Sequence, residues 1–319
     1  MNAKIIKILT AAMVVLSLAA CSHSSTPPPS AHYMEFADHQ GSQVVLAHKP
    51  QNVAVLFSSY AEIWNLAGGM VSVTVGESVE RGFAPLETPL VDDGAGKTID
   101  MELLLAAQPD FVIGSADIDA QVEACGLLRQ AGIPAALFRV DTFSDYLSML
   151  KTCTQITGDA QAYETHGTAV KGRIDEILAA AQTQQSQQKD ILFIRAGSQY
   201  SSTKAKRAPD NFVCIMLDEL GAHNIADEAE VLLDGLSLEE ILLQDPDHIF
   251  LTTMGSEQAA VSYIGELFSQ DGWKELTAVK QEQYTFLEKE LFHFKPNARW
   301  AEAYELLAKL LYPELKLGE

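Results

Sequence analysis

Residues 99–113 read IDMELLLAAQPDFVI, and residues 236–250 read LSLEEILLQDPDHIF. The two stretches align at a constant offset of 137 residues. In each copy an Asp or Ser precedes a short apolar helix with a Glu in its first turn, and a Pro-Asp pair then leads into a strand. A repeat of this length predicts two similar lobes built around the same supersecondary unit.

Short apolar strands alternate with helical segments on both sides of the repeat. This alternation is typical of an α/β fold in which each lobe has a mostly parallel sheet. At the end of the first strand, Ser59 and Glu62 have capping-box spacing, which predicts a helix start there. We expect strands at residues 53–57, 71–75, 111–114, 135–140, 191–195, 248–252 and 284–287.

Residues 156–185 contain no strand pattern and predict a single long helix bridging the lobes, or else an ordinary surface helix with a frayed end. The predicted organisation is a signal peptide (1–20), a lipidated Cys with a flexible tether and the start of a lobe (21–48), an N-terminal α/β lobe (49–155), an interlobe helix (156–187) and a C-terminal α/β lobe (188–319).

The first residues indicate the compartment. Lys4 and Lys7 precede an uncharged stretch, residues 8–20, that is too short for a membrane span and typical of a secretory signal. It ends in LAAC at residues 18–21, which resembles the bacterial lipobox and implies a diacylglycerol on Cys21. The Pro-rich stretch that follows predicts an extended tether. We therefore expect an extracytoplasmic protein held at the bacterial membrane only by its lipid.

Composition excludes several classes of function. The 319 residues carry 22 Lys plus Arg against 43 Asp plus Glu, and a formal net charge of −21 argues against a nucleic-acid partner. No GxSxG, HExxH or phosphate-binding Gly-rich loop is present, so we expect a protein that is not an enzyme and has no catalytic residues.

The remaining cysteines, Cys125, Cys153 and Cys214, show neither a CxxC nor metal-ligand spacing. Buried free thiols are expected, with a Cys125–Cys153 disulfide as the alternative. The eight His residues are scattered, so no metal site is predicted, although a lipoprotein that captures free metal ions stays an alternative function.

Several further motifs accompany the repeat: PQNVAV at 50–55, GIP at 132–134, KPNARW at 295–300 and LLYP at 310–313. In this order, and with the LAAC motif, the chain over about residues 45–313 resembles the class III periplasmic-binding-protein family. Its members are the solute-binding components of ABC importers for ferric siderophores, haem and cobalamin.

The resemblance implies two Rossmann-like lobes joined by one rigid helix, with a metal chelate bound between them and no other cofactor. A ferric siderophore is the expected chelate, and haem or a corrinoid is the alternative. The implied partner is a permease dimer with its ATPase. Glu102 and Glu239 match the family's two docking glutamates; Glu240 is a neighbouring alternative, and helix capping would also explain each Glu.

In open α/β sheets, ligands contact the loops beyond the carboxyl ends of strands. The cationic cluster of Lys204, Lys206 and Arg207, preceded by Arg195, predicts a cationic cleft suited to an anionic chelate, although a solvated loop would look similar. The ligand-binding candidates are Ser59, Tyr60, Arg81, Arg139, Arg195, Tyr200, Lys204, Phe292 and His293, and the same loops hold Ser58, Glu77, Met254, Phe294 and Lys295.

Two candidates could bind a metal directly. His293 lies between aromatic residues and could be an axial ligand to haem iron or cobalt. Tyr200 is the oxygen donor expected if iron is bound directly. Trp64 and Trp300 lie in helical patterns and are expected in the core or at the lobe interface.

Overall fold

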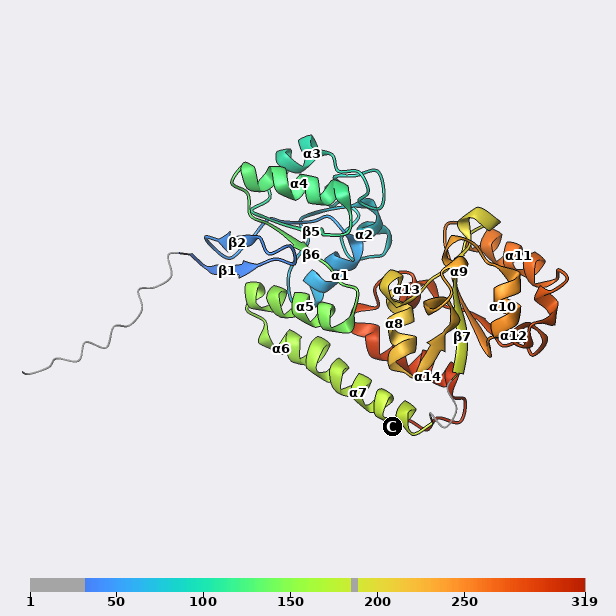
Figure 1. Cartoon of the computed structure of the whole chain (residues 1–319). Coiled ribbons are helices and arrows are strands. Elements are labelled where there is room, and N and C mark those ends of the chain that lie inside the picture. Colours follow the sequence, from blue (N-terminus) through green and yellow to red (C-terminus); the bar gives the residue numbers. More distant parts are fainter. Residues whose placement is uncertain (1–31, 185–188, 319) are drawn as a thin grey trace, which may run out of the picture. The chain divides into compact units, whose positions relative to one another are not determined.

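The computed structural model describes residues 32–184 and 189–318, so the signal segment and Cys21 lie outside the described residues (Figure 1). Within the described ranges, no helix is long and apolar enough to cross a membrane. Residues 32–319 form one compact unit, whose described residues form two larger sheets flanked by helices and one two-stranded sheet.

The N-terminal sheet is parallel throughout, with strand order β4-β3-β5-β6. Alternate residues of its strands enter two cores, because successive side chains of a strand point to opposite faces. Ala54 and Val112 pack with α3 and α4, whereas Val55 and Ile113 pack with α1 and α5. The elements are β3 Val53–Val55, α1 Ser58–Leu66, β4 Val73–Thr74, α2 Gly76–Glu80, α3 Met101–Ala106, β5 Phe111–Ser115, α4 Asp119–Gln130, β6 Ala135–Phe138 and α5 Phe143–Thr157.

The C-terminal sheet has the order β11-β10-β7-β8, and β9 pairs with the start of β7. Only the β7–β8 pair is antiparallel. Its elements are β7 Lys189–Ala196, β8 Lys204–Ala205, α8 Phe212–Glu219, β9 Ala222–Asn224, α9 Val231–Asp234, α10 Leu238–Gln244, β10 His248–Thr253, α11 Glu257–Phe268, α12 Thr277–Lys280, β11 Tyr284–Phe286, α13 Lys289–Phe292 and α14 Trp300–Leu311, with 3-10 turns at Tyr200–Ser202, Ala208–Asp210, Ile225–Asp227, Trp273–Glu275 and Asn297–Arg299.

Every strand expected from the sequence is present. The capping-box prediction for α1 is wrong: Phe57 is the N-cap, no side chain caps this end, and Ser59 lies inside the helix. The three cysteines in the described residues are buried free thiols, as expected. Trp64 and Trp300 are 3% and 1% exposed, which confirms them as core residues.

The connection between the sheets is helical but does not start where the sequence pattern suggested. Helix α5 ends at Gly158, whose φ of 80° is left-handed, and a new helix then begins with α6 Ala160–Tyr163. It continues through a π-helical turn, Glu164–Thr168, into α7 Ala169–Gln182. Helix α7 packs against α14, so the connection is tied to the C-terminal helix.

A single large core joins the two sheets. It contains side chains of β3 and β5 together with side chains of β7, α8 and α14. Trp300 is central to it, because its ring packs edge-on against Phe143 at 6.1 Å and Phe212 at 5.6 Å between ring centroids. Shared apolar packing of this kind resists relative motion of the two sheets.

A hairpin precedes the first parallel strand, within residues 21–48, where the tether and the start of a lobe were expected. It consists of β1 Met34–Ala37 and β2 Gln43–Leu46. The buried Asp38 carboxylate at its turn accepts hydrogen bonds from Leu137 N at 3.1 Å and from Arg129. The hairpin therefore fixes the carboxyl end of β6.

The 137-residue repeat is visible in the backbone. Asp100 and Ser237 cap α3 and α10, as expected. Gln108 and Asp245, which are 137 residues apart, both have a positive φ, of 52° and 43°. Each occupies the residue before the Pro-Asp turn, so both copies leave their helix through the same strained position.

Candidate functional site

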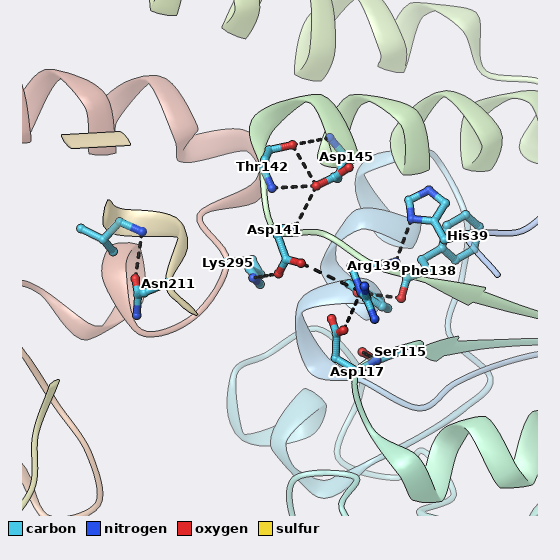
Figure 2. Close-up of polar contacts among 12 residues, drawn as sticks. His39, Ser115, Asp117, Phe138, Arg139, Asp141, Thr142, Asp145, Asn211 and Lys295 are labelled. Atoms are coloured by element: carbon cyan, nitrogen blue, oxygen red, sulfur yellow. Dashed lines mark hydrogen bonds and ion pairs between the residues drawn. The ribbon is translucent and has the colours of Figure 1, made fainter. Parts of the chain in front are cut away.

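A cavity of about 660 Å³ opens beside the carboxyl end of the N-terminal sheet and faces the segments that enter α8 and follow α13. The loops after β5 and β6 form one wall, and the segment entering α8 forms the other, together with residues that follow α13 (Figure 2). The lining residues are Asp117, Arg139, Asp141, Ala208, Pro209, Asp210, Asn211, Phe212, Ile215, His293 and Lys295.

An ion-pair network crosses this cavity. Arg139 Nε lies 2.6 Å from Asp117 Oδ1 and 4.0 Å from Asp141 Oδ2, and Lys295 Nζ lies 3.3 Å from Asp141 Oδ1. Lys295 Nζ also lies 4.9 Å from the centre of the Phe212 ring. Asp141 therefore connects the loop after β6 with the segment after α13 (Figure 2).

Local hydrogen bonds hold the β6 side of the network in place. Thr142 and Asp145 form a capping box at the start of α5, and Asp145 Oδ2 also accepts from Asp141 N at 3.1 Å. On the hairpin side, His39 Nδ1 accepts from Arg139 N at 2.9 Å. The backbone that carries Arg139 and Asp141 is thus fixed from two directions (Figure 2).

His293 contributes an imidazole to the cavity wall. Burial lowers its pKa, and the positive charges of Lys289 and Arg195 lower it further. The ring is therefore neutral at pH 7, the form that can donate a lone pair to a metal. Within the described residues, no group of three or more His, Cys, Asp or Glu side chains is placed to hold a metal ion.

The cavity lining includes two of the nine predicted ligand-binding residues, Arg139 and His293. Lys295, from the same predicted loops, lines it as well. Arg195, Tyr200 and Lys204 are not among the lining residues. Arg195 Nη2 instead lies 2.6 Å from Met254 Sδ, and Tyr200 is 58% exposed.

Two of the predicted ligand-binding residues lie in the core rather than in the cavity wall. Tyr60 and Phe292 are each 1% exposed. The Tyr60 hydroxyl donates to Phe138 O at 3.1 Å, so its polar atom is already satisfied. Tyr60 follows β3 and Phe292 follows β11, as expected, but both side chains point into the core that joins the two sheets.

Arg81 and Ser59 form a seam between the sheets beside the cavity. Arg81 Nη1 donates to Ser58 Oγ at 3.1 Å and to Ser59 Oγ at 3.2 Å. Its guanidinium lies 3.9 Å from the centre of the Phe294 ring, and Arg81 Nη2 lies 3.6 Å from Glu290 Oε2. With its side chain 9% exposed, Arg81 is committed to packing between the sheets.

The prediction of a cationic cleft is wrong for this cavity. Its lining has three carboxylates, on Asp117, Asp141 and Asp210, against the two cations Arg139 and Lys295. Asp117 and Asp141 follow strands in the same way as Arg139. The expectation that ligands contact the loops after strands could therefore have identified both residues. The aromatic residue of the wall, Phe212, had no comparable signal in the sequence.

The two predicted docking glutamates are exposed. Glu102 lies in the first turn of α3 and Glu239 in the first turn of α10, and neither forms an ion pair with another described residue. Exposed apolar side chains accompany both: Leu103 is 52% exposed and Leu243 is 77% exposed. Each lobe therefore presents a carboxylate next to leucine.

Comparison with known proteins agrees with this architecture. The profile of a family described as "Periplasmic binding protein" matches residues 53–291, which is most of the chain. The chain belongs to the periplasmic-binding-protein family. Its two α/β sheets and connecting helix correspond to class III of that family. No curated protein sequence matches the chain.

Three solved periplasmic binding proteins have a similar fold. Staphylococcus aureus SirA complexed with staphyloferrin B is 17% identical, with a TM-score of 0.67 over 87% of this chain and 98% of SirA. The haem-binding RhuT from Roseiflexus sp. RS-1 is 19% identical, with a TM-score of 0.65 over 82% of this chain and 98% of RhuT. An ABC transporter substrate-binding protein of Listeria monocytogenes EGD-e is 16% identical, with a TM-score of 0.67 over 83% of this chain and 100% of the other.

Proposed function

We propose that this periplasmic binding protein captures a metal chelate and delivers it to an ABC permease and its ATPase. A ferric siderophore is the first candidate for the chelate. The observation that carries the proposal is the cavity between the loops after β5 and β6 and the segments that enter α8 and follow α13. Its volume of about 660 Å³ lies within the range of small-molecule sites. SirA, with a similar fold, is complexed with staphyloferrin B, which supports a siderophore as the ligand.

The polar character of the wall supports a polar ligand. Arg139, Asp117, Asp141 and Lys295 supply charged donors and acceptors, and Phe212 supplies an apolar surface. The Asn211 side chain uses Oδ1 to cap α8, accepting from Val213 N at 2.9 Å, which leaves its amide N–H groups for a ligand oxygen. An oxygen-rich chelate has the matching acceptors.

Delivery requires docking on the permease. We assign this role to Glu102 and Glu239, because both carboxylates are exposed and lie at the same place in the two copies of the repeat. The two sheets share one core, which keeps the distance between Glu102 and Glu239 nearly constant. The two carboxylates can therefore contact matching sites on a two-fold symmetric partner. A diacylglycerol on Cys21 would hold the protein at the membrane surface.

Haem or a corrinoid is the second candidate ligand, and the position of His293 favours it. A neutral imidazole in the cavity wall suits an axial ligand to iron or cobalt. This candidate differs from the siderophore in one testable respect, since it depends on the imidazole nitrogen. The ligands of a ferric siderophore come from the chelator itself.

Binding assays test the proposal. Trp300 packs on Phe212 of the cavity wall, so its fluorescence should report chelate binding. Wild type is titrated with ferric siderophores, haem and cobalamin, beside a His293→Gln variant. A siderophore should bind both proteins with similar Kd, whereas haem or cobalamin should bind the variant about tenfold or more weakly. If none of these chelates binds the wild type, the proposed function is wrong.

A further inference from the structure

The charge of the cavity wall points to a class of chelate. We propose that Asp117 and Asp141 make the cavity selective for chelates with no net charge or a positive charge, and that they exclude strongly anionic ones. This inference rests on the proposed function, because it concerns the ligand of the same cavity. It also reverses the expectation of an anionic ligand that the cationic residues in the sequence suggested.

Both cations of the wall already have carboxylate partners. Arg139 is held by Asp117 at 2.6 Å, and Lys295 is held by Asp141 at 3.3 Å. The Phe212 ring covers a further side of the Lys295 ammonium group. An anionic chelate that reaches either cation is therefore placed next to a carboxylate that belongs to the protein.

The rest of the wall adds no positive charge. Asp210 accepts from Arg207 Nε at 3.3 Å, so this third carboxylate is balanced from outside the lining. His293 is neutral at pH 7 because burial lowers its pKa. The lining residues alone therefore carry one more negative than positive charge.

Two cations near the cavity, Arg195 and Lys289, have no ion-pair partner among the described residues and do not line the cavity. Arg195 and Lys289 are close enough to lower the pKa of His293. Yet Arg195 Nη2 contacts Met254 Sδ, and Lys289 Nζ lies 5.1 Å from the centre of the Phe294 ring. Their contribution to the cavity is a weak, salt-screened potential rather than a hydrogen-bonded contact.

Asp117 and Asp141 therefore decide the balance for a bound ligand. In a partly desolvated cavity, one like charge at contact distance lowers affinity by roughly tenfold or more. An uncharged chelate leaves the network intact and accepts hydrogen bonds from Arg139 and Asn211. A chelate with a pendant ammonium group gains contact with the two carboxylates.

Three probes with different charge test the inference. A ferric tris-hydroxamate is uncharged, because three hydroxamates neutralise the iron, and cobalamin is nearly uncharged. A ferric tris-catecholate is strongly anionic. The proteins are wild type, Asp117→Asn, Asp141→Asn and a matched control, Asp175→Asn, whose side chain pairs with Lys171 on α7. Thermal melts confirm that the near-isosteric variants fold.

Wild type should bind the hydroxamate or cobalamin at least tenfold more tightly than the catecholate. Asp117→Asn and Asp141→Asn should each tighten catecholate binding by roughly tenfold and change binding of the uncharged probes by less than about threefold. Asp175→Asn should change nothing.

Two results would overturn the inference while leaving the proposed function intact. One is tighter binding of the catecholate than of both uncharged probes by wild type. The other is unchanged catecholate affinity in both cavity variants. If wild type binds none of the probes and no haem, the proposed function itself fails.

Discussion

Arg81 illustrates how a residue expected to bind ligand instead joins the two sheets. Its guanidinium is packed between Phe83 and Phe294, at 4.7 Å and 3.9 Å from the ring centres, and donates to the hydroxyls of Ser58 and Ser59. Such contacts are worth more in a desolvated seam than at the surface. The seam lies at the start of α1, where a ligand loop was expected.

Arg81→Ala should lower the free energy of unfolding by about 2–3 kcal/mol, because it removes both the packing and the hydrogen bonds. Arg81→Met restores most of the packing and should fall between Ala and wild type. Glu290 is the matched control: its side chain is 52% exposed, so Glu290→Gln should cost less than about 1 kcal/mol. Urea denaturation measures all three. A loss for Glu290→Gln as large as that for Arg81→Ala would contradict this account of the seam.

For single residues, the sequence predicted which loops lie at the cavity better than it predicted which side chains of those loops point into it. Arg139 and His293 reach the cavity, whereas Tyr60 and Phe292 follow equivalent elements and turn into the core. The end of a strand indicates where a ligand-binding loop begins. Which side chain of that loop faces the ligand depends on how the neighbouring helices pack. Ion-pair partners are equally hidden, because Lys295 and Asp141 are distant in sequence.

At the scale of elements, the strands were predictable because their apolar runs are local. The repeat also gave the caps of α3 and α10 correctly. The β1–β2 hairpin was missed because its strands are short and half exposed and follow a polar, Pro-rich stretch of sequence. Its role, holding the end of β6 through Asp38, depends on residues about a hundred positions away.

His248 at the start of β10 gives a pH dependence to the second sheet. Burial lowers its pKa to about 4, and the ring stacks on Phe250. In the unfolded chain its pKa is near 6.5, so the unfolded state binds a proton that the native state excludes. The stability that the buried neutral ring contributes is therefore fully present above pH 6.5 and is lost as the pH falls towards 4.

Between pH 6.5 and pH 4, the free energy of unfolding of the wild type should fall by up to about 3 kcal/mol more than that of a His248→Gln variant. Because carboxylates titrate in both proteins over this range, the quantity that tests the prediction is the difference between their urea-unfolding free energies at each pH. A difference that does not change with pH would show that His248 is protonated equally in the folded and unfolded chains.

In the whole molecule, one core packs against both sheets and so limits changes in the distance between Glu102 and Glu239, the proposed docking residues. Glu102→Lys or Glu239→Lys should abolish chelate uptake by cells, while the Kd of the purified protein changes by less than about twofold. The control is Glu176→Lys, on an exposed position of α7, which should transport normally. Loss of chelate binding in the docking variants would instead make these glutamates structural.

Anomalous diffraction locates the bound iron itself. Crystals grown with a saturating ferric siderophore that binds in solution, ferric tris-hydroxamate as the first choice, are measured at the iron absorption edge. We expect one anomalous iron peak inside the cavity lined by Arg139, Asn211, His293 and Lys295. An iron peak elsewhere, for example beside Arg195 and Lys204 with this cavity empty, would contradict the assignment of this cavity as the binding site.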